Sequence, residues 1–175
     1  HLQNMFATGL TVTNLSSPGS GVNSFQVGAS SAATNEASTA VGYTAVAYGL
    51  YGTAIGALTY SIGEGATSIG PQSRAEADGA TAIGSNSEAT GTNSTILGVS
   101  SFASAHNSIA IGYGGHADHM NSMSVLGAQT TRSNQLHIGS AELFTAGYIN
   151  AGGYTNAHLR GTNIAMAFGF VRTNN

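Results

Sequence analysis

A glycine recurs at every fourteenth position through the middle of the chain, and this period constrains the fold more than any other feature of the sequence. The residue before each glycine is valine, isoleucine or leucine, and from residue 39 onward a β-branched residue stands two positions before that aliphatic. Such residues favour strands. The unbroken period indicates a repeat architecture. The glycines are Gly28, Gly42, Gly56, Gly70, Gly84, Gly98 and Gly112.

A second strand is predicted half a period away from the first. One register there holds only alanine or serine, from Ala33 to Ala117, and the residue that follows each of these small residues varies without pattern. Alternation of small and variable positions is typical of a strand with one buried and one solvated face.

The turns between these strands also repeat. Gly65, Gly79, Asn93, Asn107 and Asn121 share one register, and both residue types tolerate a positive φ. Each repeat is thus two short strands and two tight turns, too small to bury a face alone. Stacking of repeats solves this problem, so residues 26–139 are predicted to form an all-β solenoid, a parallel β-roll with 14-residue coils.

The strand that ends in glycine carries no charge on either face in these repeats. One face holds threonine and the aliphatic residues, and the other holds small residues such as Ala82 and Ala110. A strand of this kind needs cover on both faces, and one cover must come from another chain. We expect a cyclic homo-oligomer, most simply a homotrimer. In the arrangement that we favour, the aliphatic residues fill the coil and the small residues face the symmetry axis; the reverse arrangement is the alternative. The aliphatic residues are Val41, Ile55, Ile69, Ile83, Leu97 and Ile111.

The two ends of the chain differ from the repeats. Residues 1–25 hold a short strand at 10–12 and a turn-rich connector, and the first residue, His1, indicates a processed or excised fragment. After Gly112 the period slips, because the next glycines come fifteen and then twelve residues later, which predicts irregular last coils. In residues 140–175, apolar alternation and a Gly152-Gly153 pair predict a small C-terminal β cap.

The stretches "NSIAIG" (residues 107–112) and "ATAIGSNSEATGTNS" (80–94) resemble the head repeats of YadA-type trimeric autotransporter adhesins. The resemblance covers about residues 26–127, and it implies a left-handed parallel β-roll with three chains to a head. Similar repeats are also a feature of bacteriophage tail fibres and other virion projection proteins. The sequence sustains no apolar heptads like those of the family's stalk, and it shows no strands like its membrane anchor.

Composition narrows the classes of partner. Only 6% of residues are charged, all four basic residues are arginines and the net charge is −3, so no basic footprint for nucleic acid is present. No apolar stretch is long enough to span a membrane as a helix. We expect an extracellular location, on a virion projection or a bacterial cell surface.

Sequence motifs give little support to catalysis. No G-x-S-x-G elbow occurs, and "GEGATS" (63–68) lacks the third glycine of a phosphate-binding loop. Glu76 and Glu88 are the best carboxylate pair for a glycosidase, but their positions predict solvated surface. We expect no enzyme and no cofactor. His116 and His119, with His106 nearby, are candidate metal ligands if three chains meet there; the alternative is a register that relaxes as the roll ends.

Tyrosines are the best candidates for ligand contacts. Tyr43, Tyr48, Tyr51 and Tyr60 lie on consecutive coils, with Ile62 beside them. Exposed aromatic rings stack on sugars and anchor protein partners, although tyrosines also simply cover neighbouring coils. The predicted cap offers a rival surface with Tyr148, Tyr154 and Arg160.

Together these features predict a non-enzymatic homotrimeric attachment protein. It would be a receptor-binding segment of a phage tail fibre or the head of a bacterial surface adhesin, and its partner a host cell-surface glycan or outer-membrane protein. A structural virion cement or decoration protein, which docks on a capsid and contacts other virion proteins, is the first alternative. A polysaccharide depolymerase is the second.

Overall fold

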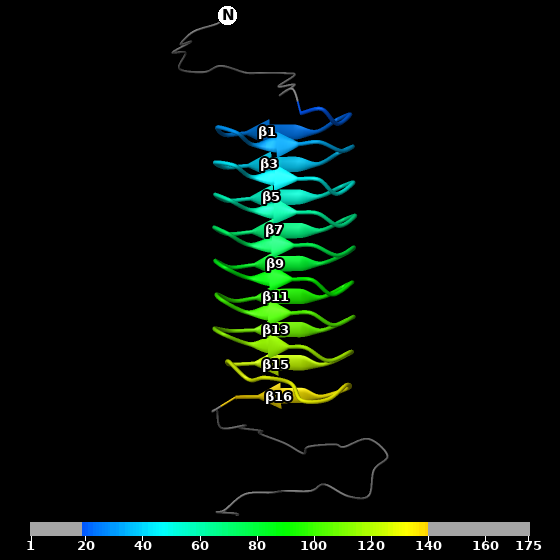
Figure 1. Ribbon diagram of the computed structural model, residues 1–175, viewed down its shortest axis with the longest axis vertical. Helices are drawn as coiled ribbons and strands as arrows, with labels where there is room; N and C mark the ends of the chain where they lie inside the picture. The colour runs from blue at the N-terminus through cyan, green and yellow to red at the C-terminus, as the bar shows by residue number, and fades with distance from the viewer. Residues whose placement is uncertain (1–18, 140–175) are drawn as a thin grey trace, which may run out of the picture. The chain divides into compact units, whose positions relative to one another are not determined.

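The computed structural model describes residues 19–139, and these residues form one stack of coils with no helix (Figure 1). Each regular coil contributes one strand to each of two sheets, in which every strand pairing is parallel. Sheet A has nine strands: β1 (Phe25–Val27), β3 (Thr39–Val41), β5 (Thr53–Ile55), β7 (Thr67–Ile69), β9 (Thr81–Ile83), β11 (Thr95–Leu97), β13 (Ile109–Ile111), β15 (Met123–Val125) and β16 (Leu136–Ile138). Sheet B has seven: β2 (Ala32–Ala33), β4 (Val46–Ala47), β6 (Tyr60–Ser61), β8 (Arg74–Ala75), β10 (Glu88–Ala89), β12 (Phe102–Ala103) and β14 (His116–Ala117).

The register between neighbouring coils is 14 residues from β1 to β15. Thr81 of β9 pairs with Thr95 of β11, for example, and Arg74 of β8 pairs with Glu88 of β10. Equivalent residues of successive repeats therefore stand in columns along the solenoid. The predicted parallel β-solenoid with 14-residue coils is confirmed.

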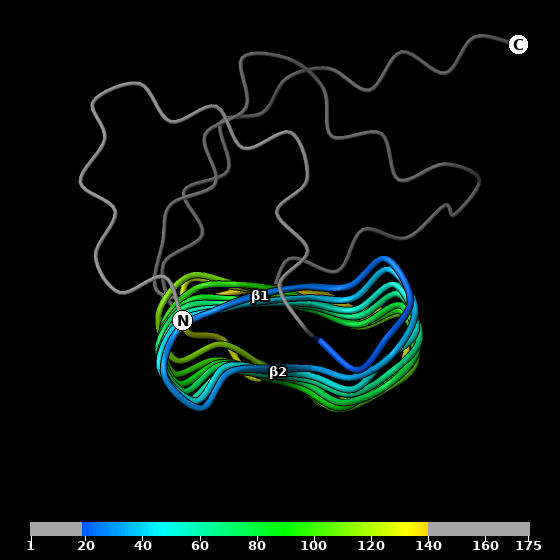
Figure 2. The ribbon, with the colours of Figure 1, turned by 90° about the horizontal axis from the view of Figure 1, so that it is seen from above.

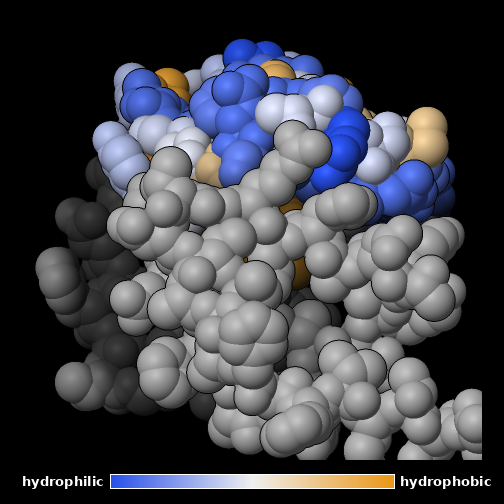
Figure 3. Space-filling model, turned by 90° about the horizontal axis from the view of Figure 1, so that it is seen from below, coloured by the Kyte–Doolittle hydropathy of each residue, from blue (hydrophilic) through white to orange (hydrophobic). Residues whose placement is uncertain are grey.

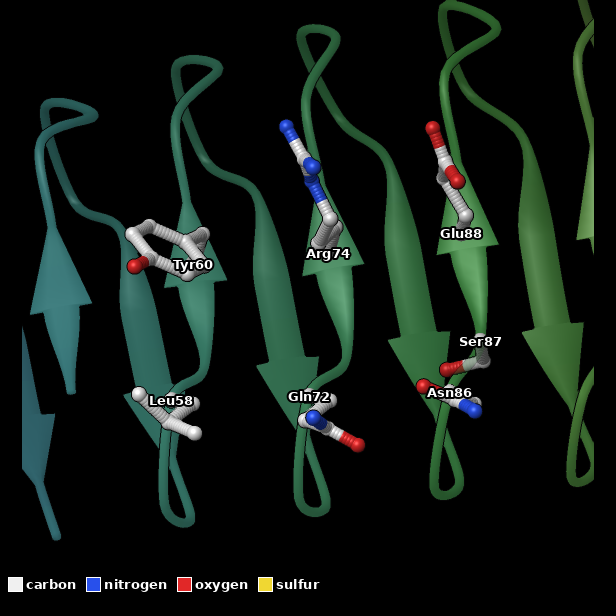
Figure 4. A pocket seen from close by; sticks show the side chains of 7 residues that line it. All are labelled: Leu58, Tyr60, Gln72, Arg74, Asn86, Ser87 and Glu88. Atoms are coloured by element: carbon white, nitrogen blue, oxygen red, sulfur yellow. The ribbon is translucent and has the colours of Figure 1, made fainter. Parts of the chain in front are cut away.

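The solenoid is left-handed. In the view from the N-terminal end, the chain passes counterclockwise from β1 to β2 as it recedes from the viewer (Figure 2). The close-up of sheet B agrees, because its strands run upward in front of the downward strands of sheet A as the chain advances to the right (Figure 4). The handedness implied by the family resemblance is thus confirmed.

The interior of each coil is lined by very small side chains. The middle residue of each regular sheet A strand from β3 to β15 and the last residue of each sheet B strand are fully buried and face each other across the coil. All of these residues are alanine or serine except Ile96. From β1 to β15 only four or five residues connect one strand to the next, so the two sheets lie close together and leave little room between them.

The favoured arrangement of the two faces of sheet A is therefore wrong, because the small residues lie inside the coil and the aliphatic residues lie outside it. Ala82 and Ala110 lie inside the coil with 0% exposure, whereas the aliphatic residues that flank them point outward. The reason is space, since two facing rows of alanine and serine already fill the narrow coil. The outward, partly or well exposed aliphatic residues are Val41, Ile55, Ile69, Ile83, Leu97 and Ile111.

The turns repeat with half the period of the coils. A residue with positive φ occurs at every seventh position from Asn23 to Asn121, so the two turns of a coil have the same backbone conformation. The predicted turn register is confirmed, with φ between 54° and 65° at Gly65, Gly79, Asn93, Asn107 and Asn121. The next residue often closes the turn with its side chain: the Ser108 hydroxyl donates to the Ala105 carbonyl at 2.7 Å.

The glycine column marks the closest approach between coils. A Cβ atom at Gly84 would overlap the carbonyl oxygen of Gly98 in the next coil, and Gly84 has a φ of 135°. Both constraints exclude larger residues. The fourteen-residue glycine period thus reflects backbone-to-backbone stacking of successive turns.

Both ends of the described stack depart from the regular coil. After β15 the register shortens, because Met123 pairs with Leu136 after only thirteen residues and Gln129 makes an isolated bridge to His116; the predicted irregular coils are confirmed. Polar residues take the inward register at both ends. Gln26 accepts from the Ala33 amide at 3.1 Å, and His137 Nδ1 lies 2.6 Å from the Gln129 carbonyl. The coloured surface at the β16 end is largely hydrophilic (Figure 3).

Several predicted elements lie outside the described residues. These are the strand at 10–12 and the C-terminal β cap at 140–175 with Tyr148, Tyr154 and Arg160. Within residues 19–139, no helix is long and apolar enough to cross a membrane.

Candidate binding site

The outer face of sheet A is uniform and apolar. Across all nine strands its outward residues are threonine, aliphatic, methionine or, in β1, phenylalanine, and none carries a charge. In the row of aliphatic residues that ends each strand, Val27, Ile55 and Leu97 are 39–53% exposed, so apolar side chains face solvent along the sheet. Rows of this extent mark protein interaction surfaces.

The outer face of sheet B is chemically varied. Its two outward columns change from coil to coil, as in Tyr60 and Ile62, then Arg74 and Glu76, then Glu88 and Thr90. The residues between these columns are the buried Ser61, Ala75 and Ala89, so the varied side chains all stand on the same side of the sheet. This face can carry recognition without disturbing the repeat.

A shallow groove of about 350 Å³ lies along this face near the turns that lead into sheet B. Figure 4 shows its walls as two columns that span three successive coils. Leu58, Gln72 and Asn86 form the turn column, and their φ values of 57°, 59° and 57° are all left-handed. Two residues further along each coil, Tyr60, Arg74 and Glu88 form the strand column. The buried Ser87 joins the two columns at the third coil.

Arg74 lies at the centre of the strand column. Its Nη2 atom is 2.5 Å from Glu76 Oε1, and its Cζ atom is 5.8 Å from the centroid of the Tyr60 ring. The first contact is an ion pair and the second has cation–π geometry. Because the Arg74 and Glu76 side chains are 48% and 30% exposed, the pair holds the guanidinium in place more than it stabilises the fold.

The tyrosines predicted to bind ligand do not form one patch. Tyr43 (61% exposed) lies in a turn that leads into sheet B, the same side as the groove, and Tyr60 lines the groove itself. Tyr48 (51%), Tyr51 (55%) and Ile62 (39%) lie toward the opposite turns. Tyr48 and Ile62 are neighbours in one outward column, because Ala47 pairs with Ser61.

The predicted histidine cluster is spread over different faces. His116 is exposed on sheet B, with its ring 6.1 Å from that of Phe102, while His119 lies in a turn with Nδ1 3.4 Å from Thr130 Oγ1. His106 is exposed in the turn one coil earlier. Within residues 19–139, no three potential metal ligands are grouped together.

Most residues of the groove were not predicted from the sequence. Leu58, Gln72, Arg74 and Asn86 were not singled out, and Glu88 was considered only as a catalytic carboxylate. A usable signal was present, because residues 60, 74 and 88 are spaced by the repeat length and must form a column. The turn column is predicted in the same way, because residues 58, 72 and 86 lie two positions before residues 60, 74 and 88.

Comparison with known proteins agrees with this architecture. Residues 33–59, 61–87 and 89–114 match the family model described as "YadA head domain repeat (2 copies)". Heads of the YadA type are trimeric and belong to surface-exposed adhesins. No curated protein matches the sequence significantly.

Proposed function

Because this chain carries YadA head domain repeats, we propose that it is the receptor-binding head of a homotrimeric, non-enzymatic attachment protein. It would act on a phage fibre or on a bacterial cell surface, and its partner would be a glycan or protein exposed on a host cell. The observation that carries the proposal is the contrast between the two outer faces: sheet A is uniformly apolar and sheet B is varied.

The uniform face of sheet A suits a symmetric interface between copies of this chain. In a cyclic trimer each coil meets the equivalent coils of its partners, so every coil needs the same apolar surface. The column of threonine and aliphatic residues meets this need from β3 to β11. Three chains that bury this face against one another would form a rigid rod with sheet B outward.

The varied face of sheet B suits recognition of another molecule. Its side chains change every fourteen residues, while the buried row behind them stays alanine or serine. No chemical step is part of the proposal. Glu76, one of the two carboxylates considered for glycosidase chemistry, is held in an ion pair with Arg74.

The proposal is tested by the native mass of the purified chain, followed by pull-down on whole bacterial cells and on empty capsids. A trimer that binds cells and ignores capsids is the expected result. A trimer that binds capsids alone would replace attachment with a cement function. A monomer would contradict the assignment of sheet A, and shortening of a capsular polysaccharide over time would contradict the non-enzymatic function.

A further inference from the structure

The groove on sheet B combines the groups that recognise a sugar. Tyr60 offers an apolar ring, and Figure 4 shows it on the coil next to that of Arg74. Hydrogen-bond donors come from the Arg74 guanidinium and from the amides of Gln72 and Asn86, and the Glu88 carboxylate accepts. A sugar presents C–H faces to rings and hydroxyl groups that both donate and accept. From this match we propose that the groove binds a neutral oligosaccharide.

The charges around the groove favour a neutral ligand. Arg74 is its one cation, and this cation already contacts Glu76 and is the strand-pairing neighbour of Glu88. An acidic sugar or a phosphate would therefore meet more negative than positive charge. Neutral hydroxyl groups can use both the guanidinium and the carboxylate, and they bring no charge of their own.

The length of the groove suits a short stretch of a glycan chain. The two columns run along the solenoid axis through three coils, a length of two strand spacings or about 10 Å. That length suits about two sugar rings in line.

The turn column is built on the left-handed turn that recurs along the solenoid. Leu58 and Gln72 hold left-handed φ angles, a conformation that costs non-glycine residues about 1 kcal/mol or more. In the same register of later coils, Asn86 and Gly114 adopt this conformation at lower cost. Thr44 and Ser100 hold the same conformation in this register outside the groove, so the conformation belongs to the repeat and the side chains at 58 and 72 distinguish the groove. The larger side chains of Leu58 and Gln72 build the wall of the groove.

This inference deepens the proposed function and rests on it in one respect. A trimer that buries sheet A would expose three copies of the groove, one on each chain. Weak binding at each copy would then combine into strong attachment to a surface that repeats the same glycan.

The experiment is an array of neutral oligosaccharides built from hexoses and N-acetylhexosamines, with sialylated versions of the same chains and a set of peptides. The neutral oligosaccharide that gives the strongest signal is then titrated by calorimetry against the intact protein and its variants. Tyr60→Ala should weaken binding about tenfold, and the isosteric Glu88→Gln should weaken it severalfold. Phe102→Ala is the matched control: it removes an aromatic ring from the same column, outside the groove, and should change the affinity by less than about twofold.

The isosteric Glu88→Gln change should leave the fold intact, and circular dichroism checks that each variant is folded before its affinity is measured. Binding of peptides or sialylated chains in preference to neutral ones would overturn the inference, and so would equal affinity of wild type and a folded Glu88→Gln. If wild type binds cells but the groove variants bind them equally well, the groove inference fails and the attachment function stands. If wild type binds a neutral oligosaccharide through Tyr60 but binds no cells, the attachment function fails and the groove stands.

Discussion

The outer faces of sheet A and sheet B are built from the same repeat but differ in what varies along them. On sheet A, β5, β7 and β9 present threonine and isoleucine at identical outward positions. On sheet B, the strands of the same coils present tyrosine, arginine and glutamate at one outward position. Both faces cover an equally small, equally buried interior. The interior therefore does not explain the difference.

The difference indicates that a requirement for the same residues on every coil can be imposed by a partner chain rather than by the packing of the coil itself. Backbone stacking accounts for the glycine column, and the narrow coil accounts for the alanine and serine rows. Neither accounts for isoleucine on the outer face of sheet A, where Ile55 is 39% exposed. In the proposed trimer, a symmetric partner that meets every coil in the same way would account for it. Sheet B would have no such partner and could vary.

The largest expected effect comes from a charge inside the coil. Ala82→Glu should lower the free energy of unfolding by about 5 kcal/mol or prevent folding, because Ala82 is 0% exposed among alanines and offers a carboxylate no partner. Thermal unfolding followed by circular dichroism measures the change. Tyr48→Glu adds the same charge at a 51% exposed position of sheet B and should change stability little. If the Ala82→Glu protein folds normally and loses only its oligomeric state, Ala82 belongs to the interface between chains and not to the interior of the coil.

The failure to predict which row of sheet A faces inward has a physical cause. The repeat, the strands, the turns and the parallel stacking all follow from positions that recur in the sequence. Which face of a strand is inside depends on the distance between the two sheets, and a single strand does not encode that distance. A signal was available in combination: Ala82 and Ala89 both belong to rows of small residues, and two such rows facing each other define a narrow coil.

The groove was harder to predict, because it depends on pairs of columns rather than on recurring residues. Tyr60 was identified for its chemistry. Arg74 and Gln72 were not, since a repeat search discards positions that vary. Once the register is known, the varied positions place every outward side chain beside its neighbour one repeat away.

The next effect compares the two faces directly. Ile55 and Ile62 are both 39% exposed, lie seven residues apart and stand on sheet A and sheet B respectively. Ile55→Asp should convert the trimer into monomers, because three unpaired carboxylates would be buried at one level of the interface. Ile62→Asp should leave the trimer intact. Light scattering coupled to gel filtration measures both masses, and identical behaviour of the two variants would remove the distinction between the faces.

The smallest effect concerns the turn column of the groove and separates stability from binding. Leu58→Asn should raise the free energy of unfolding by about 1 kcal/mol, because asparagine adopts a left-handed φ more readily than leucine. The reverse exchange, Asn86→Leu, is the matched control, since it places leucine in the same turn register two coils later and should lower stability by a similar amount. Thermal unfolding of the two variants measures this difference. The stabilised Leu58→Asn protein should bind the neutral oligosaccharide more weakly, because it loses the apolar wall that faces Tyr60. A variant that gains stability and keeps its full affinity would mean that the strain at Leu58 serves something other than the groove.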